Sequence, residues 1–387
     1  MHRRTEKLLE LLKASGLKVA TQDYSYVSAG RNITGNNVYA VLRGPRADAT
    51  EAIVLMGAWR TMANEVNQSG VALVLTLARY FKRWSLWSKD IIFVIPSDPL
   101  AGSEAWVSAY HDAHDTVRVQ PLPLKSGALQ GAIAVEYPAG PWGHRFDKLH
   151  VMYNGINGQL ANLDLFNTFV SIASGQMGIG CTIQRMWKHD DSYEERLTTI
   201  LRGMLDQGLG HASGPHSSFV PYHVDALTVQ TVGDGWHDEM SLGRTVESMF
   251  RSLNNLLEHL HQSFFFYLLM HANRFVSIGT YLPAAMIIAA SFSITAVALW
   301  VQSGRPAPVT NVASTMATEK KEPEKMRLVQ DGGKVALVPE SALEVVERHL
   351  FLPITFVCGA HFLGLVPLYL FTHIPQSVSS NPHNSHH

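Results

Sequence analysis

One uncharged segment constrains this chain more than any other feature of its sequence. No charged side chain occurs between Phe275 and Gly304, and a helix that crosses a bilayer needs about 20 mostly apolar residues. We therefore predict a transmembrane helix over residues 277–301, with Phe275 and Trp300 among its aromatic anchors. The part before it, residues 1–270, is predicted to form one folded water-soluble domain.

A second apolar stretch lies closer to the C-terminus. Residues 350–372 contain no Asp, Glu, Lys or Arg, although they include Pro353 and Pro367. Proline is tolerated in membrane helices because neighbouring groups satisfy the carbonyls that it frees. We predict a second transmembrane helix here, followed by a disordered polar tail over residues 373–387.

The segment between the two stretches sets the predicted orientation. Residues 302–348 carry seven lysines and arginines, and basic residues favour the cytosolic side whereas acidic ones have little influence. This segment is therefore predicted to be a cytosolic loop, which places residues 1–270 in the lumen. Two glycosylation sequons in that domain, at Asn32 and Asn67, agree with a lumenal location.

Charge and cysteine content exclude several functions. The formal net charge of -1 gives no electrostatic basis for binding nucleic acid. The two cysteines, Cys181 and Cys358, are too few for a cysteine-rich zinc site.

The N-terminal segment is an amphipathic helix rather than an apolar signal peptide. We therefore expect the true N-terminus, with its targeting segment, to lie outside this sequence.

Short apolar segments alternate with amphipathic helical segments before residue 240. Strands are predicted at residues 35–44, 52–57, 90–96, 132–136, 150–153 and 227–231, and helices at 3–15, 70–84, 103–111, 163–174 and 193–205. This alternation is typical of an α/β fold with a mixed, largely parallel sheet flanked by helices. Apolar residues at helical spacing predict a further long helix over 241–269 that continues towards the membrane.

The strands and the turns that follow them resemble those of zinc-dependent aminopeptidases of the glutaminyl-cyclase and transferrin-receptor type. The similarity covers about residues 1–240. It rests on two strings, IVLMGAWRTMANEVNQSGVALVLTLARYF from Ile53 and IIFVIPSDPLAGSEAW from Ile91. The resemblance implies the aminopeptidase fold, in which the metal ligands follow the ends of the strands.

Most of the metal ligands that this resemblance implies are replaced. The ligand positions hold residues that cannot bind zinc: Trp59, Thr61, Val66, Pro96 and Ser97. Only Glu136 and His216 keep ligand-type side chains. Catalytic zinc needs three protein ligands and an open position, so we expect no hydrolytic two-zinc site, and a lone histidine such as His216 is more typical of a structural role.

Three further strings resemble the Gaa-type subunit of GPI transamidase: GSEAWVSAYHD at 102–112, INGQLANLDLFN at 156–167 and LNNLLEHLHQSFFFYLL at 253–269. The match covers about residues 5–305, without the membrane helix that precedes the lumenal domain in that family. The resemblance implies a subunit of the endoplasmic-reticulum membrane complex that attaches GPI anchors. It implies as partners the GPI glycolipid and the other subunits, including a cysteine-protease-like catalytic subunit.

The resemblance also implies a ligand site near the membrane. It places a divalent cation, Mg²⁺ or Ca²⁺, between Glu136 and Gln262, where the cation would bridge the GPI head group. Polar donors just above an aromatic run make His261, Gln262 and Ser263 the predicted GPI-binding residues. Structural alternatives stay open, because Glu136 could cap a backbone group or pair with a Lys or Arg, and the polar residues could rim an interfacial aromatic belt.

We therefore predict a non-catalytic subunit of GPI transamidase that binds and presents the GPI lipid for attachment to the C-terminus of proproteins. Two alternatives remain. A membrane-bound metallo-aminopeptidase or amide-forming enzyme with a rearranged metal site would bind zinc stoichiometrically. A purely structural assembly subunit would lose the complex, rather than anchor attachment alone, when Gln262 and Ser263 are mutated.

Overall fold

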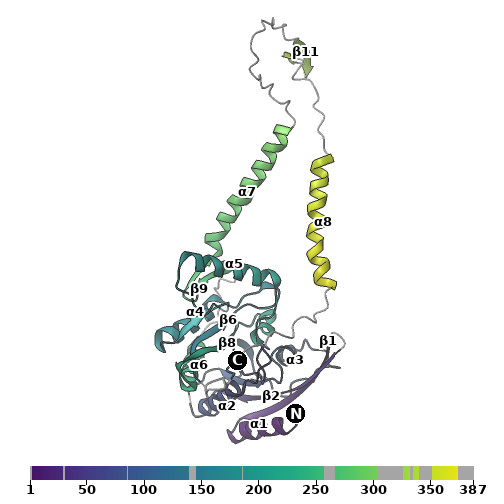
Figure 1. The fold of residues 1–387 in the computed structure, drawn as a ribbon. Helices are drawn as coiled ribbons and strands as arrows, with labels where there is room; N and C mark the ends of the chain where they lie inside the picture. The colour runs from purple at the N-terminus through teal and green to yellow at the C-terminus, as the bar shows by residue number, and fades with distance from the viewer. Residues whose placement is uncertain are drawn as a thin grey trace, which may run out of the picture. The chain divides into compact units, whose positions relative to one another are not determined.

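The computed structural model, drawn as a ribbon in Figure 1, describes most of the chain. The described residues are 2–28, 31–84, 86–138, 145–184, 186–256, 266–303, 326–331, 334–339 and 351–373. The chain divides into two compact units, Met1–Leu282 and Pro283–His387. Helix α7 (Ile278–Ser303) crosses this boundary, so its first residues belong to the first unit.

An eight-stranded mixed sheet forms the centre of the first unit, in the order β1-β2-β4-β3-β5-β8-β6-β7. Its strands are β1 (Lys18–Ser28), β2 (Arg31–Leu42), β3 (Glu51–Met56), β4 (Asp90–Ile95), β5 (Ala128–Glu136), β6 (Phe146–Met152), β7 (Gly180–Thr182) and β8 (Ala226–His237). The four neighbouring strands β4, β3, β5 and β8 run parallel to one another. The predicted fold class, a largely parallel sheet flanked by helices, is therefore confirmed.

The central strands are buried on both faces, which explains their continuous runs of Ile, Val and Leu. Alternate residues of β3 divide between two cores: Ile53 and Leu55 belong to one, and Val54 and Met56 to the other. The first core also contains apolar side chains from α1 (His2–Ala14), α2 (Gln68–Lys82), α4 (Leu163–Val170) and α6 (Glu239–Asn255). The second core contains Trp106 of α3 (Ala101–Tyr110). Helices therefore cover both faces of the sheet.

The sequence prediction missed several strands and misassigned the end of one helix. Strand β1 was not predicted, and the predicted helix over 241–269 is confirmed only as far as Asn255. Helix α6 ends at Asn255 because Leu256 has extended backbone angles. Residues Tyr267–His271 form strand β9, which pairs antiparallel with β10 (Arg274–Ser277). Phe275, predicted as an anchor of the membrane helix, lies in β10.

The second unit contains the remaining apolar helices. Helix α7 is long and apolar enough to cross a bilayer over Ile278–Val301. Helix α8 (Phe351–His373) has a shorter apolar stretch, Phe351–Leu363, among its described residues. A hairpin of β11 (Met326–Asp331) and β12 (Lys334–Pro339), which the sequence did not predict, lies within the predicted cytosolic loop. The predicted tail beyond residue 373 lies outside the described residues.

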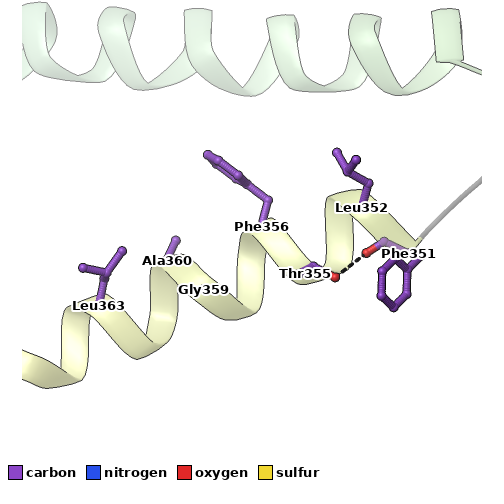
Figure 2. A pocket seen from close by; sticks show the side chains of 7 residues that line it. All are labelled: Phe351, Leu352, Thr355, Phe356, Gly359, Ala360 and Leu363. Carbon is purple, nitrogen blue, oxygen red and sulfur yellow. Dashed lines mark hydrogen bonds between the residues drawn. The ribbon is translucent and has the colours of Figure 1, made fainter.

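The first turns of α8 present apolar side chains on opposite sides of the helix. Figure 2 shows Leu352, Phe356 and Leu363 projecting from one side, beside a hollow of about 470 Å³, and Phe351 projecting from the other. The hydroxyl of Thr355 donates to the Phe351 carbonyl at 2.8 Å, so this polar group is satisfied within the helix. An apolar surface on both sides is typical of a helix surrounded by lipid.

Strand β9 is held to the first unit by a buried hydrogen bond. The Tyr267 hydroxyl donates to the Ala161 carbonyl at 2.6 Å, and both groups lie away from water. We predict that Tyr267→Phe lowers the free energy of unfolding by about 1–2 kcal/mol, because the Ala161 carbonyl loses a buried partner. Tyr193→Phe, at an exposed tyrosine, is the matched control and should leave stability unchanged. Thermal unfolding of the full chain in detergent, followed by near-ultraviolet circular dichroism, measures both; equal effects of the two variants would contradict the prediction.

Candidate functional site

The carboxyl ends of the parallel strands meet at one edge of the sheet, where ligands bind in open α/β folds. Backbone hydrogen bonds join the segments that follow these strands. The Trp59 amide donates to the Pro96 carbonyl at 2.8 Å, and the Asn67 amide donates to the Trp59 carbonyl at 2.9 Å. The residues after β3 and β4 therefore form one connected wall at this edge.

Glu136, the last residue of β5, lies within this wall and is fully buried. Its Oε1 accepts a hydrogen bond from the Met62 amide at 3.2 Å, whereas its Oε2 is buried without a partner among the described residues. Burial, opposed in part by the Met62 hydrogen bond and reinforced by the charge of Glu65, raises the pKa of Glu136 to about 7. The side chain is therefore divided between its protonated and ionised forms near neutral pH, with one oxygen available to a further partner.

Asn67 fixes the position of Glu136. Its Nδ2 donates to the carbonyls of Ala58, at 2.8 Å, and Val135, at 2.9 Å, while its Oδ1 accepts from the Tyr137 amide at 2.6 Å. These bonds join the segment after β3 to the end of β5. The sequence marked Asn67 as a glycosylation site, but a fully buried nitrogen that donates two hydrogen bonds cannot carry a glycan in this fold. Asn32, the other sequon, is exposed on β2.

Three of the positions at which the sequence resemblance leads us to expect zinc ligands serve other contacts. The Trp59 ring lies 4.7 Å from the Arg4 guanidinium, the Thr61 hydroxyl accepts from the Glu65 amide at 3.2 Å, and the Ser97 hydroxyl is 2.9 Å from the Tyr24 hydroxyl. Within the described ranges, no group of three or more His, Cys, Asp and Glu side chains could hold a metal ion. The described donors therefore do not fit a catalytic zinc centre.

His216 has both ring nitrogens occupied. Its Nδ1 is 2.7 Å from the Thr228 hydroxyl and its Nε2 is 3.0 Å from the Asn154 carbonyl. Burial lowers the pKa of His216 to about 4, so the ring is neutral at physiological pH. The neutral ring donates from Nε2 to the carbonyl and accepts at Nδ1 from the hydroxyl. This arrangement fits the structural interpretation of His216 rather than a role as a metal ligand.

A cavity of about 550 Å³ is lined by residues that neighbour Glu136, although not by Glu136 itself. The lining includes Met62, whose amide donates to Glu136, and also Gln230 and His150. Gln230 of β8 is the Cα partner of Glu136, and His150 of β6 is the Cα partner of Gln230. Two amide oxygens of the lining, Asn154 Oδ1 and Gln184 Oε1, are buried without partners in the described structure. Buried acceptors of this kind favour a ligand that brings N–H or O–H donors, or a cation that prefers oxygen ligands.

The predicted GPI-binding residues His261, Gln262 and Ser263 lie outside the described residues. Of the predicted cation site between Glu136 and Gln262, the described residues include Glu136. The unpartnered carboxylate oxygen there suits one ligand position of a hard cation such as Mg²⁺ or Ca²⁺. Sequence reasoning missed the cavity residues Asn154 and Gln184, since nothing in their local sequence marks them.

The chain was compared with known proteins. The family described as "Gaa1-like, GPI transamidase component" matches residues 34–387. The Schizosaccharomyces pombe protein "GPI transamidase component gaa1" is 39% identical over 302 residues, which are 76% of this chain and 52% of that protein. The Saccharomyces cerevisiae protein "GPI transamidase component GAA1" is 36% identical over 274 residues, 70% of this chain and 43% of that protein. The chain thus spans about half the length of these curated relatives.

Two solved structures illustrate a weaker likeness. The Legionella pneumophila LapA aminopeptidase is 12% identical with a TM-score of 0.42, over 65% of this chain and 63% of that chain. The Fimbriiglobus ruber glutaminyl cyclase is 15% identical with a TM-score of 0.41, over 65% of this chain and 87% of that chain. At these scores, neither likeness supports a conclusion about this chain.

The pKa of Glu136 predicts a pH-dependent effect of Glu136→Gln. The folded-state pKa of about 7 lies above the ordinary value of 4.5, so the folded state binds more protons and ionisation costs it stability as pH rises between these values. The variant should match the wild type in stability below pH 4.5 and exceed it by about 3 kcal/mol above pH 7. Denaturant unfolding in the presence of a chelator measures this difference. Glu6→Gln, at an exposed carboxylate of α1, is the control, and a difference that does not change with pH would contradict the prediction.

The geometry of the two sequons predicts different glycan occupancy. We expect glycopeptide mass spectrometry of the protein, expressed in a eukaryotic secretory pathway, to find a glycan on Asn32 and none on Asn67, because only Asn32 is exposed. Asn32→Gln should remove the glycan and leave stability unchanged, whereas Asn67→Gln should lower stability without changing the glycan content. A glycan on Asn67 of the folded protein would show that this geometry is incorrect.

Proposed function

The chain belongs to the Gaa1-like family of GPI transamidase components, and we propose that it is a non-catalytic subunit that binds the GPI lipid and presents it for attachment to the C-terminus of proproteins. The proposal covers the activity and partners of the whole assembly, since the chain spans about half of its curated relatives. It places the large domain in the endoplasmic-reticulum lumen and the apolar helices in the membrane.

The observations that carry this proposal are the unpartnered Oε2 of Glu136 and the two unpartnered amide oxygens of the nearby cavity, Asn154 Oδ1 and Gln184 Oε1. The ethanolamine phosphate and sugar groups of a GPI head supply ammonium and hydroxyl donors, which are the complements of buried carboxylate and amide oxygens. A divalent cation held by Glu136 and Gln262 would supply positive charge for the phosphates of the same head group. The residues His261, Gln262 and Ser263 would bind the head group directly.

The amide-forming chemistry is assigned to a partner. This assignment is supported by Trp59, Thr61 and Ser97, which stand where zinc ligands would be expected and make contacts with other protein groups. Burial raises the pKa of Cys181 to about 12, so this thiol is not a nucleophile at neutral pH. A cysteine-protease-like subunit would therefore carry out the transfer, while this chain holds the lipid.

The proposal predicts a loss of anchor attachment without a loss of the complex. We expect Glu136→Ala, Gln262→Ala and Ser263→Ala each to lower GPI-anchor attachment in isolated membranes by about tenfold or more, which corresponds to at least about 1.4 kcal/mol of lost binding. Co-purification of the other subunits should remain unchanged. Glu6→Gln, at an exposed carboxylate of α1, is the control and should keep full activity.

Other outcomes separate the alternatives. Loss of co-purification in the Gln262 and Ser263 variants would favour a purely structural assembly subunit. Stoichiometric zinc in the purified protein, together with inactivation by Glu136→Ala alone, would favour a metal-dependent enzyme. Normal attachment in all three variants would remove the proposed head-group site.

A further inference from the structure

Helix α5 (Tyr193–Leu209) turns its apolar residues away from the protein. Leu197, Leu201 and Leu205, spaced four residues apart and hence on one side of the helix, are 45%, 57% and 61% exposed. Met204 and Tyr193 are exposed as well. The two buried residues of the helix are instead Thr199 and Gly203. A surface helix of a soluble protein normally has the opposite arrangement, so the exposed leucine side requires a partner of its own.

Close packing on the inner side fixes this orientation. A Cβ atom on Gly203 would lie 2.8 Å from Gln184 Nε2, so the helix approaches this segment more closely than a larger residue would allow. The Thr199 hydroxyl donates to the Glu195 carbonyl at 2.8 Å and lies 2.8 Å from the Met186 sulfur. Rotation that buried the leucines would bring larger side chains into this space, so the apolar side stays outside.

The neighbours of α5 indicate what covers that side. Helix α5 packs against β9, whose partner β10 continues without a linker into α7. Asp191, just before α5, binds Arg196 of α5 at 2.7 Å and Arg274 of β10 at 3.0 Å. Arg274 is four residues from Ile278, the start of the apolar span, and four extended residues reach about 14 Å. The beginning of α5 is thus tied to the segment that enters the predicted span.

We propose that α5 lies on the bilayer surface, with Leu197, Leu201 and Leu205 in the boundary between lipid head groups and acyl chains. This rests on α7 crossing the membrane, as in the function proposed above. The interfacial region extends several ångströms beyond the hydrocarbon, and helices of this kind bury their apolar face about 5–10 Å into the head-group boundary. A lipid surface accounts for an apolar side that extends from Leu197 to Leu205, while the exposed Glu194 of the first turn can reach the head groups.

Fluorescence quenching in the full chain tests this proposal. In a Cys181→Ala, Cys358→Ala background, a single cysteine replaces Leu201, Ala290 of α7 or the exposed Val117, and each is labelled with a polarity-sensitive fluorophore. The labelled chains are reconstituted into phosphatidylcholine vesicles with and without brominated acyl chains. We expect bromination to remove about half of the emission at positions 201 and 290, where the labels reach the acyl boundary, and none at 117.

The controls separate this proposal from the one on which it rests. If position 290 is quenched by the brominated lipid while position 201 behaves like position 117, α5 does not touch the bilayer but α7 still spans it. If position 290 is not quenched either, the span and the α5 proposal both fail. A label at position 201 that aqueous iodide quenches in vesicles, but not in the assembled complex, would assign the leucine side to another subunit and overturn the proposal. Near-ultraviolet circular dichroism confirms that each labelled chain is folded.

Discussion

The three hydrogen bonds of the Asn67 side chain hold the functional edge of the sheet together. They connect the Ala58 and Val135 carbonyls with the Tyr137 amide and so join two chain segments that are distant in sequence. Each of these backbone groups is buried and would be costly to leave unsatisfied. Because this network contains only protein groups, the edge keeps its geometry without a metal ion. The shape of this edge therefore does not depend on whether the surrounding side chains can bind a metal ion.

Burial shifts the pKa values of His216 and Glu136, the two side chains at this edge that could bind a metal ion, in opposite directions. His216 is buried with partners for both nitrogens and stays neutral, because burial lowers its pKa. Glu136 is buried with a partner for only one oxygen, and burial raises its pKa. Burial disfavours the charged form in both cases, but only Glu136 keeps an atom that can bind something else. Of these two side chains, Glu136 is therefore the candidate for ligand binding.

Features that repeat along the sequence were predictable, and features that depend on distant contacts were not. Continuous Ile and Val runs gave the central strands β3 and β4, and a carboxylate at the end of a buried strand drew attention to Glu136. The first residues of the segment Tyr267–His271 were predicted to continue a helix, but the hydrogen bond of Tyr267 to Ala161 and the pairing with β10 hold the segment as a strand. Asn67 was predicted to be glycosylated because its local sequence is a sequon. Its structural role could not be predicted, since it depends on carbonyls that other segments contribute. Asn154 and Gln184 reach the cavity only through the packing of α5 and β6.

Helix α5 lines the cavity with one side and exposes apolar residues on the other. Arg202 and Asp206 line the cavity beside Glu136, while Leu201 and Leu205, their immediate neighbours in sequence, point outward. Any displacement of this helix changes both surfaces together, so the free energy of lipid contact and the free energy of cavity occupancy are thermodynamically linked. If the leucines rest on the bilayer, the thickness and head-group packing of the membrane would change the affinity of the cavity for its ligand. A bound head group would in turn alter how deeply the helix sits in the lipid.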